Sequence, residues 1–377
     1  MYEYATLTVS SETCKIRVKI CLKVGIIMLL FHNDYNECCH SAVWSHMQSY
    51  LEQQMNGYGE DTCCASAAER IRKLCNDDSL SVHFLVGGTQ TNLTVIDAAL
   101  RPHQAALCAC SGHINIHETG AVEATGHKVL TVESKDGKIT AQQIEQVLKT
   151  HLADASKEHI AQPKLVYISN STELGTIYHL RELEEISAVC KAYNLYLFMD
   201  GARLGYAMAA KDNDVTFADL ARLTDVFYIG GTKVGAMFGE AVVISNPVIS
   251  EDFRYLIKQH GGMLAKGWLL GAQFDALLKD NLYLQIAAHA NRLADQIRQT
   301  LFSLGYTMLV DGTTNQLFPI LPDSLLEQLQ KSFTFSEQER VDAQYRAVRF
   351  CTSWATKQES VDALCAALVK FSKCVLS

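Results

Sequence analysis

Residues 195–203 read Leu-Tyr-Leu-Phe-Met-Asp-Gly-Ala-Arg, an unbroken apolar run followed by an acidic residue. Such a run, without polar alternation, is typical of a strand buried on both faces of a parallel sheet. Open α/β sheets bind ligands at the carboxyl ends of their strands, so we expect Asp200 at a ligand site. A partly buried carboxylate needs a cationic partner. Two partners fit: Arg203, in a structural ion pair, or the protonated ring nitrogen of a cofactor.

The same pattern extends along the chain on both sides of this run. Apolar stretches that suit strands lie at 82–86, 105–110, 128–132, 164–169, 226–229 and 241–244. Segments with helical apolar spacing separate several of them, at 91–100, 140–150 and 181–193. The alternation predicts an α/β fold with a mostly parallel sheet that helices cover on both faces.

The organisation of the chain changes after residue 265. Long helical patterns at 268–279 and 283–304 precede short strand-like segments at 306–310, 316–321 and 347–352 and a final helix. This pattern predicts a smaller C-terminal α+β domain. We expect an N-terminal extension over residues 1–30, a large domain with its N-terminal arm over 31–262, and the small domain over 263–377.

Composition excludes several classes of protein. The chain has 377 residues, of which 48% are hydrophobic and 20% charged, so it is not disordered. Its net charge of −8 (33 − 41) argues against nucleic-acid binding, which concentrates Lys and Arg. The 13 cysteines form no CxxC pair and suit reduced thiols in a cytoplasmic protein. The apolar run at 24–31 is too short to span a bilayer, so no stable membrane insertion is expected.

The C-terminus is open to two interpretations. The chain ends Cys374-Val-Leu-Ser377, which fits a prenylation pattern. The alternative is the frayed end of an apolar helix, which we favour because only Lys370 and Lys373 are close by as basic residues.

Two further strand ends carry glycine-rich loops. Residues 87–92 read Gly-Gly-Thr-Gln-Thr-Asn between a strand and a helix, which suits either a phosphate cradle at the helix N-terminus or an ordinary turn. The loop is neither a Walker motif nor GxGxxG. Residues 230–233 read Gly-Gly-Thr-Lys and place Lys233 at the same sheet edge, where small neighbours leave room around its amine. Most lysines, in contrast, are solvated surface groups.

A histidine-containing stretch at 110–120 completes the set. His113 and His117 are four residues apart and could ligate zinc from a helix, but no further ligand is obvious, so we expect a stacking or proton-handling role and no metal. A phosphate cradle, an aspartate, an arginine and a lysine on successive strand ends form the constellation of a pyridoxal-phosphate enzyme. In such enzymes the lysine forms a Schiff base and the aspartate keeps the pyridine nitrogen protonated.

With these motifs the chain resembles the L-threonine aldolases, of the fold-type-I pyridoxal-phosphate and β-eliminating lyase family, from about residue 31 to the end. The resemblance is carried by Asn-Asp at 33–34, Tyr-Gly-Glu-Asp at 58–61, the 87–92 loop, His113 with Glu-Thr-Gly at 118–120, Asp-Gly-Ala-Arg at 200–203, Lys233, Thr-Asn-Gln-Leu-Phe at 314–318 and Arg349. It implies the transferase-like fold of type I, with a large domain and a smaller C-terminal α+β domain.

The resemblance also implies roles for residues around the cofactor. Seven would contact pyridoxal 5′-phosphate, the first two at its phosphate: Gly88, Thr89, His113, Asp200, Arg203, Thr232 and Lys233. His113 would stack on the ring, Asp200 would pair with the ring nitrogen, and Lys233 would form the Schiff base. Arg203 would support the phenolic oxygen or the substrate carboxylate. His113, Asp200, Arg203 and Lys233 would be the catalytic residues.

Further residues are implied at the substrate. Arg349 would clamp the substrate carboxylate, bidentate by preference. Asn33, Tyr58 and His159 would also bind substrate, with His159 near its hydroxyl group. Family members share sites between subunits, so Tyr58 and Lys258 would reach a partner's site in a homotetramer built from dimers.

The implied reaction is a retro-aldol cleavage of L-threonine, L-allo-threonine and similar β-hydroxy-α-amino acids to glycine and an aldehyde. His113 or an ordered water would take the β-hydroxyl proton. Alternatives that keep the cofactor are β-elimination and transamination on another amino acid, and a third is a non-catalytic homologue. An NAD-dependent dehydrogenase is excluded by the lack of GxGxxG.

Three departures from the family pattern stand out. Thr232 replaces the usual serine before the lysine and keeps a hydroxyl group. Thr352-Ser353 stands where the family has Thr-His, a departure that bears on which β-substituent of the substrate fits. Residues 1–27 have no counterpart.

Overall fold

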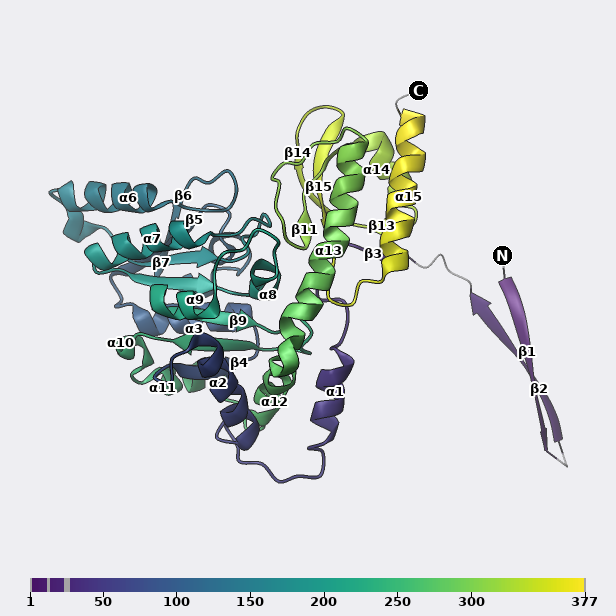
Figure 1. The fold of residues 1–377 in the computed structure, drawn as a ribbon, viewed down its shortest axis with the longest axis horizontal. Helices are drawn as coiled ribbons and strands as arrows, with labels where there is room; N and C mark the ends of the chain where they lie inside the picture. Colours follow the sequence, from purple (N-terminus) through teal and green to yellow (C-terminus); the bar gives the residue numbers. More distant parts are fainter. Residues whose placement is uncertain (1, 12–13, 24–27, 376–377) are drawn as a thin grey trace.

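The computed structural model describes residues 2–11, 14–23 and 28–375. Its centre is a seven-stranded sheet with the strand order β4-β10-β9-β8-β7-β5-β6 (Figure 1). The strands are β4 (Ser81–Leu85), β5 (Gln104–Ala109), β6 (Lys128–Val132), β7 (Gln162–Ser169), β8 (Tyr196–Asp200), β9 (Val226–Gly230) and β10 (Glu240–Ile244). In this sheet β10 runs antiparallel to β4 and β9, and the other neighbours are parallel. The predicted α/β architecture is therefore confirmed.

The direction of β10 has a consequence for the edge of the sheet. Because β10 is antiparallel to its neighbours, its first residue, Glu240, pairs with Leu85 and Gly230 at the ends of β4 and β9. The carboxyl ends of β4, β7, β8 and β9 and the start of β10 therefore share one edge.

Helices cover both faces of the sheet, which explains the unbroken apolar strands. In β8, Leu197 and Met199 belong to the hydrophobic core on one face, whereas Phe198 belongs to the core on the other. Successive strand residues point to opposite faces, so a doubly covered strand has no polar position. The helices of the large domain are α1 (Ser41–Gln48), α2 (Thr62–Cys75), α3 (Gly88–Ala99), α4 (His113–Ile116), α5 (Ala121–Ala124), α6 (Ala141–Ala153), η1 (Lys157–His159), α7 (Leu180–Ala192), α8 (Leu204–Met208), α9 (Phe217–Leu223), α10 (Pro247–Ser250), α11 (Phe253–Gln259) and α12 (Trp268–Leu277).

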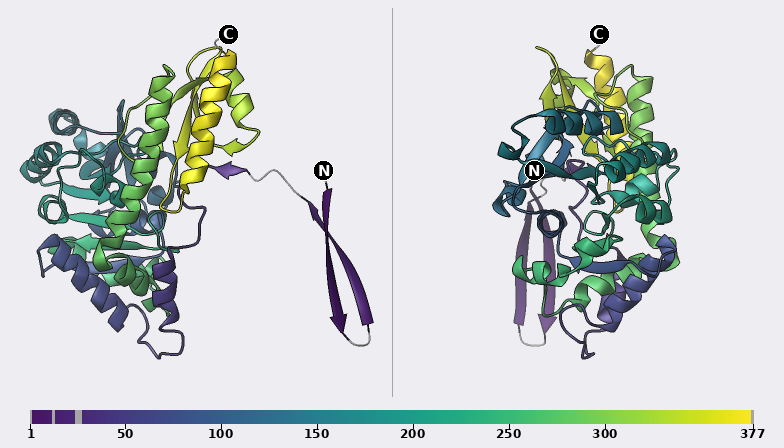
Figure 2. Two further views of the ribbon diagram at one scale, coloured as in Figure 1. Left: turned by 45° about the vertical axis from the view of Figure 1, so that its right-hand side comes forward. Right: turned by 90° about the vertical axis from the view of Figure 1, so that its left-hand side faces the viewer.

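The C-terminal part is a smaller α+β unit. Its strands β11 (Gln316–Leu317), β12 (Ile320–Pro322) and β14 (Ser336–Arg340) all pair with β15 (Tyr345–Cys351). The segment at 306–310 forms no strand and contributes an isolated bridge between Met308 and Pro319. Helices α13 (Leu282–Ser303), preceded by η2 (Lys279–Asn281), α14 (Asp323–Leu329) and α15 (Gln358–Val375) pack on this sheet, with α13 beside α15 (Figure 2).

One large-domain core and the small-domain core meet along α13, later in the chain than the boundary expected at 262–263. Tyr283 and Ala290 of α13 pack in the large-domain core, whereas Leu293 and Leu301 pack in the small-domain core. Helix α12, expected in the small domain, also packs in the large one. A long helix spanning both cores leaves no composition signal at the boundary.

The N-terminal region reaches the small domain before the large one. Strand β1 (Tyr2–Ser11) pairs with β2 (Cys14–Lys23) in an antiparallel hairpin. Strand β3 (Leu29–Leu30) pairs with β13 (Phe333–Thr334), and Phe31 is buried in the small-domain core. Of the apolar run at 24–31, residues 24–27 lie outside the described residues. So do residues 376–377, and the prenylation alternative stays a prediction.

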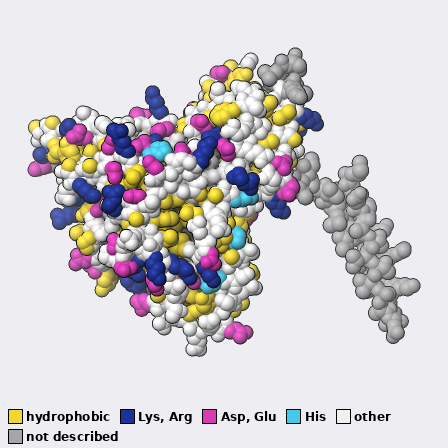
Figure 3. All heavy atoms as spheres, viewed as in Figure 1, with side chains coloured by type: hydrophobic (Ala, Val, Ile, Leu, Met, Phe, Trp, Pro, Cys, Tyr) yellow, Lys and Arg dark blue, Asp and Glu magenta, His cyan; other side chains and the backbone are white. Residues whose placement is uncertain are grey.

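Charged side chains of both signs lie on the surface. On the face in Figure 3, acidic and basic side chains are interspersed. Among the helices that the structure describes, none is long and apolar enough to cross a membrane.

The close contact of β8 and β9 depends on Gly201. Gly230 N donates a hydrogen bond of 2.9 Å to Gly201 O. A Cβ on Gly201 would lie 1.6 Å from Tyr228 O. Gly201→Ala should therefore cost more than the about 1–3 kcal/mol of ordinary overpacking. We expect a clearly lower Tm in thermal denaturation followed by circular dichroism.

Gly87→Ala is the matched control, since its extended backbone (φ −178°) suits any residue and nothing lies within 4 Å of the added Cβ. Equal Tm values for the two variants would contradict this account of the β8–β9 contact.

Candidate active site

A cavity of about 300 Å³ opens at the shared sheet edge. It is lined by the ends of β4, β7, β8 and β9, the start of β10 and the first residues of α3 and α4. All seven residues expected around a cofactor line it: Gly88, Thr89, His113, Asp200, Arg203, Thr232 and Lys233. The structure therefore brings together residues that are far apart in the sequence.

Asp200 ends β8 and is buried, yet it is held in the ionised form. Its Oδ2 accepts hydrogen bonds from Tyr167 Oη (2.5 Å) and Asn92 Nδ2 (3.0 Å), and its Oδ1 accepts one from Ala202 N (2.9 Å). Burial by itself raises the pKa of Asp200, but the charge of His113 and these donors outweigh it and hold the pKa below its ordinary value. A buried anion here suits a cationic ligand atom.

Lys233 follows β9 in the turn Gly231-Thr232-Lys233, among small residues. Burial, and the charge of Arg203 nearby, lower the pKa of its ammonium group below the ordinary lysine value. The Thr232 hydroxyl accepts a hydrogen bond from Gly239 N (3.0 Å), which closes the turn. A lysine with a lowered pKa offers more neutral amine, which is the nucleophilic form.

Glu240, which the sequence interpretation missed, lines the same cavity. Its Oε2 accepts from Gly231 N (3.1 Å), and burial raises its pKa to about 8. The only signal in the sequence was its place before an apolar strand, because nothing there shows that this strand is antiparallel.

Arg203 is committed to a partner from the N-terminal arm. Its Nε and Nη2 donate to the two carboxylate oxygens of Asp34 at 2.8 and 3.0 Å, and both side chains are buried. Asn315 Nδ2, from the small domain, donates to the same carboxylate (2.9 Å). Arg203 also lines the cavity. Asp34 belongs to the Asn-Asp motif at 33–34, but nothing in the sequence identified Arg203 as its partner.

His113 is oriented by a buried carboxylate. Its Nδ1 lies 2.8 Å from Glu118 Oε1, which also accepts from Asn92 Nδ2 (2.7 Å). The Glu118 carboxylate accepts the hydrogen bond from His113 Nδ1, so this nitrogen carries a proton. The other ring nitrogen, Nε2, takes no part in the contact between the two side chains. Asn92 thus connects Glu118 with Asp200.

The start of α3 offers an unblocked helix N-terminus. Its N-cap, Gly87, provides no side-chain cap, and the first turn has no acidic residue. A Cβ on Gly88 would stand 3.3 Å from Tyr228 Oη, so a larger residue would crowd the cradle. Free N–H groups at a helix N-terminus bind anions such as phosphate.

Arg349 lies on β15 of the small domain. It donates to His32 O (2.8 Å) and Gln316 Oε1 (3.3 Å), while its Nε is buried without a partner among the described residues. A buried guanidinium N–H without an acceptor suits an anionic ligand. The charge of Arg349 also contributes to lowering the pKa of His117, after burial and His113.

The four residues expected at the substrate, Asn33, Tyr58, His159 and Arg349, are not among those that line the cavity. Asn33 is half-buried and accepts from Tyr35 N (3.1 Å); Tyr35 itself lines the cavity. Tyr58 is 48% exposed, and its ring centre lies 5.0 Å from Lys258 Nζ, away from Lys233 of the same chain.

His159 does not reach the site. It is exposed in η1, ahead of β7, at the amino edge of the sheet. The cavity lies at the opposite edge of the sheet, so His159 does not approach the cavity of its own chain, and we withdraw its substrate role. Among the described residues, no group of His, Cys, Asp and Glu side chains could hold a metal ion.

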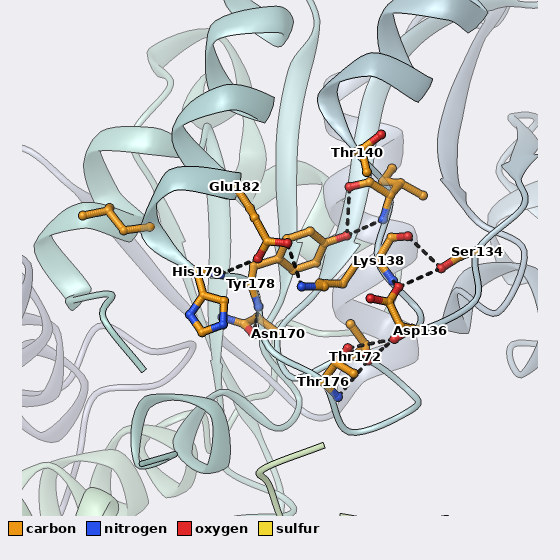
Figure 4. A network of polar contacts seen from close by, with 12 residues as sticks. Ser134, Asp136, Lys138, Thr140, Asn170, Thr172, Thr176, Tyr178, His179 and Glu182 are labelled. Atoms are coloured by element: carbon orange, nitrogen blue, oxygen red, sulfur yellow. Dashed lines mark hydrogen bonds and ion pairs between the residues drawn. The ribbon is translucent and has the colours of Figure 1, made fainter. Parts of the chain in front are cut away.

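The loop after β7 is anchored by a polar network (Figure 4). Thr172 and Thr176 both donate to Asp136 O, at 3.3 and 2.7 Å. Tyr178 Oη accepts from Ile139 N (2.8 Å), and Lys138 pairs with Glu182 (2.7 Å). This network fixes the loop that carries Glu173 into the cavity.

Comparisons with known proteins agree with this geometry. The family model for β-eliminating lyases matches residues 39–322. A low-specificity L-threonine aldolase of a Pseudomonas species is 31% identical over 89% of this chain and 95% of its own length. A solved threonine aldolase of Leishmania major is 45% identical, with a TM-score of 0.89 over 91% of this chain and 99% of its own.

A solved aspartate aminotransferase of Thermus thermophilus, 16% identical, shares the fold with a TM-score of 0.69 over 93% of this chain and 92% of its own. At this level of sequence identity the likeness supports the predicted fold type I and carries no information on the reaction. The family match and the Pseudomonas relative together establish the family predicted from the motifs: this chain belongs to the β-eliminating lyases, with L-threonine aldolases among its relatives.

Proposed function

We propose that this protein is a pyridoxal-5′-phosphate-dependent aldehyde-lyase that cleaves L-threonine and L-allo-threonine to glycine and acetaldehyde. The observation that carries the proposal is one cavity lined by an ionised, buried Asp200 and a Lys233 of lowered pKa. The relatives from Pseudomonas and Leishmania major are named threonine aldolases, which supports the same reaction here.

The residues of the cavity fit pyridoxal 5′-phosphate at three points. The unblocked N-terminus of α3 at Gly88 and Thr89 suits the phosphate. Asp200 suits a protonated ring nitrogen, because it is anionic and its other hydrogen bonds are already made. The amine of Lys233 suits an aldehyde carbon. When bound, this group supplies an electron sink for the bond that breaks at Cα.

The chain's own residues then bind and orient the amino acid. Arg349 Nε provides an unpaired donor for the substrate carboxylate. Arg203 keeps its charge balanced by Asp34, which allows a guanidinium group to stay buried beside the ligand. His113, held through Nδ1 by Glu118, lines the cavity in a fixed position.

β-Elimination and transamination use the same aspartate and lysine, so the residues described so far do not separate them from aldol cleavage. The reactions differ in their products: pyruvate and ammonia, or a keto acid, instead of glycine and an aldehyde. Retention of Lys233, Asp200 and Arg349 together opposes a non-catalytic role, because a scaffold has no need for all three.

We also propose a homotetramer built from dimers that share sites, located in the cytoplasm. Tyr58 and Lys258 contact each other at the surface, outside the cavity of their own chain, which supports a role at a partner's site. The cysteines whose side chains are described are free thiols, which suits a reducing compartment.

The function is tested by visible spectroscopy and product analysis. We expect a yellow band in the purified protein with pyridoxal phosphate, a shift of that band with glycine, and acetaldehyde from L-threonine. Lys233→Ala should lose the band and the product but keep its circular dichroism. Lys149→Ala, an exposed lysine on α6, should keep all three. Pyruvate instead of acetaldehyde, or full turnover in Lys233→Ala, would refute the proposal.

Asp200→Asn should weaken cofactor binding and slow cleavage by about 100-fold or more, the cost of losing an electrostatic partner in a buried site. Asp225→Asn is the control. Asp225 is also an aspartate beside a strand, but it directly precedes β9, at the edge of the sheet opposite the cavity, where it accepts a hydrogen bond from Leu197 N. Near-normal kcat in Asp200→Asn would contradict the role of the carboxylate.

Light scattering of the purified protein should give the mass of four chains of 41.8 kDa. A monomer that retains full activity would exclude shared sites.

A further inference from the structure

Glu173 is a cavity residue to which no role has yet been assigned. It lies on the loop after β7 and lines the cavity with His113 and Asp200. Oε1 accepts from Ser169 Oγ (2.7 Å) and from His113 N (3.0 Å). Its second oxygen, Oε2, accepts from no other residue that the structure describes, which leaves it able to act on a ligand in the cavity.

The position of Glu173 is fixed from several sides. Thr172 N donates to Thr176 O (2.9 Å) and Gly175 N to Thr172 O (3.0 Å), so Glu173 lies inside a closed turn. The polar network around Asp136 holds that turn on the large domain (Figure 4). Thr314 of the small domain donates to Gly175 O (2.8 Å). A group held this way reacts without a cost of reorganisation.

The order of the strands places Glu173 at one end of the cavity. The loop at Gly88 follows β4, and Glu240 starts β10 beside it, so both lie at the phosphate end. Asp200 ends β8, near the middle. Glu173 follows β7 and His113 follows β5, at the other end. Of Glu173 and Glu240, the two cavity carboxyl groups of raised pKa, Glu173 is the one away from the phosphate cradle.

The electrostatic surroundings of Glu173 suit proton transfer. Burial raises its pKa above the ordinary value, and the charge of Asp200 adds to the effect, while Ser169 and His113 partly oppose it. No lysine or arginine forms an ion pair with it among the described residues. A carboxylate with a raised pKa is a stronger base, and its conjugate acid is populated nearer neutral pH.

We propose that Glu173 is a catalytic residue of the lyase reaction: its Oε2 takes the proton of the substrate's β-hydroxyl group as the Cα–Cβ bond breaks. This role rests on the function proposed above and deepens it. It gives to Glu173 the place that had been expected for His159, and it replaces His113 or a water as the acceptor of that proton.

The step balances. The hydroxyl proton moves to Glu173, and the O–H electron pair becomes the second bond of the aldehyde carbonyl. The electron pair of the Cα–Cβ bond stays on Cα, where the bound cofactor accommodates it. A proton delivered to Cα then gives glycine, and loss of the Glu173 proton to solvent restores the carboxylate.

The test uses two reactions of one holoenzyme, with Glu173→Gln as the variant. Glutamine keeps the acceptor for Ser169 and His113 N but is no base. Cleavage of L-threonine should fall by about 100-fold or more, the usual share of a general base. Exchange of the α-proton of glycine with D2O, followed by NMR, needs no β-hydroxyl acceptor and should stay within about threefold of the wild type. The control is Glu327→Gln, an exposed glutamate on α14, which should change neither rate.

A second readout uses the protein without cofactor. The titratable groups that face Glu173 are His113, Asp200, Tyr167, Cys108 and Tyr178. A glutamate whose folded pKa is raised stabilises the fold below its unfolded pKa, and this stabilisation is lost as pH rises through the folded pKa. Between pH 5 and 8 the wild-type Tm should therefore fall relative to that of Glu173→Gln.

The outcomes are distinct. Threonine cleavage at the wild-type rate in Glu173→Gln would overturn the role of Glu173 but not the proposed function. An equal loss of threonine cleavage and glycine exchange would also overturn it, because it would mean that Glu173 has a structural role. Parallel Tm profiles would show that Glu173 has no raised pKa and would also count against it. A wild-type protein without cofactor band or glycine exchange would instead overturn the proposed function, and this role with it.

Discussion

The buried ion pair between Asp34 and Arg203 connects the parts of the molecule that build the cavity. Asp34 comes from the N-terminal arm, Arg203 follows β8, and Asn315, which donates to the same carboxylate, belongs to the small domain. Burial alone would raise the pKa of Asp34, but Arg203 and Lys233 outweigh it and hold the pKa below its ordinary value. Removing one partner of such a pair typically costs about 3–5 kcal/mol, because the other charge stays buried. The relative position of the two domains and the electrostatics of the site therefore depend on the same contact.

Within the cavity, three carboxyl groups differ in protonation because their surroundings differ. Asp200 receives three hydrogen bonds and the field of His113, which favour the anion. Glu240 is buried and Glu173 is partly buried, both with fewer donors, and their pKa values are raised. One strong anion suits a permanent cation, and groups that change protonation suit proton transfer. The differences follow from the donors and nearby charges, since burial raises the pKa of all three and the side chains carry the same functional group.

The sequence alone was sufficient to locate the site residues that directly follow a recognisable strand and whose side-chain chemistry also indicates a role. Asp200 and Lys233 follow apolar strands directly, so the sheet rule places both at one edge. The partners of these residues were harder to see. Asp34 and Arg203 are 169 positions apart, and nothing local in either motif names the other. Glu240 precedes an apolar strand like any other, and its place at the site depends on that strand being antiparallel. The domain boundary was hidden because α13 is apolar on the faces toward both cores.

His159 and Glu173 show how topology decides between candidates that sequence distance cannot rank. Both flank β7, one before it and one after it, and a parallel strand sends its two flanks to opposite edges of the sheet. A histidine before the strand is separated from the ligand by the length of the strand, whatever its chemical suitability. Glu173, four residues beyond Ser169, returns to the strand end through a closed turn. There Ser169 Oγ donates a hydrogen bond of 2.7 Å to its Oε1. For this role a glutamate is a less expected residue type than a histidine. Glu173 is nevertheless the better candidate, because it lies at the edge of the sheet that holds the cavity.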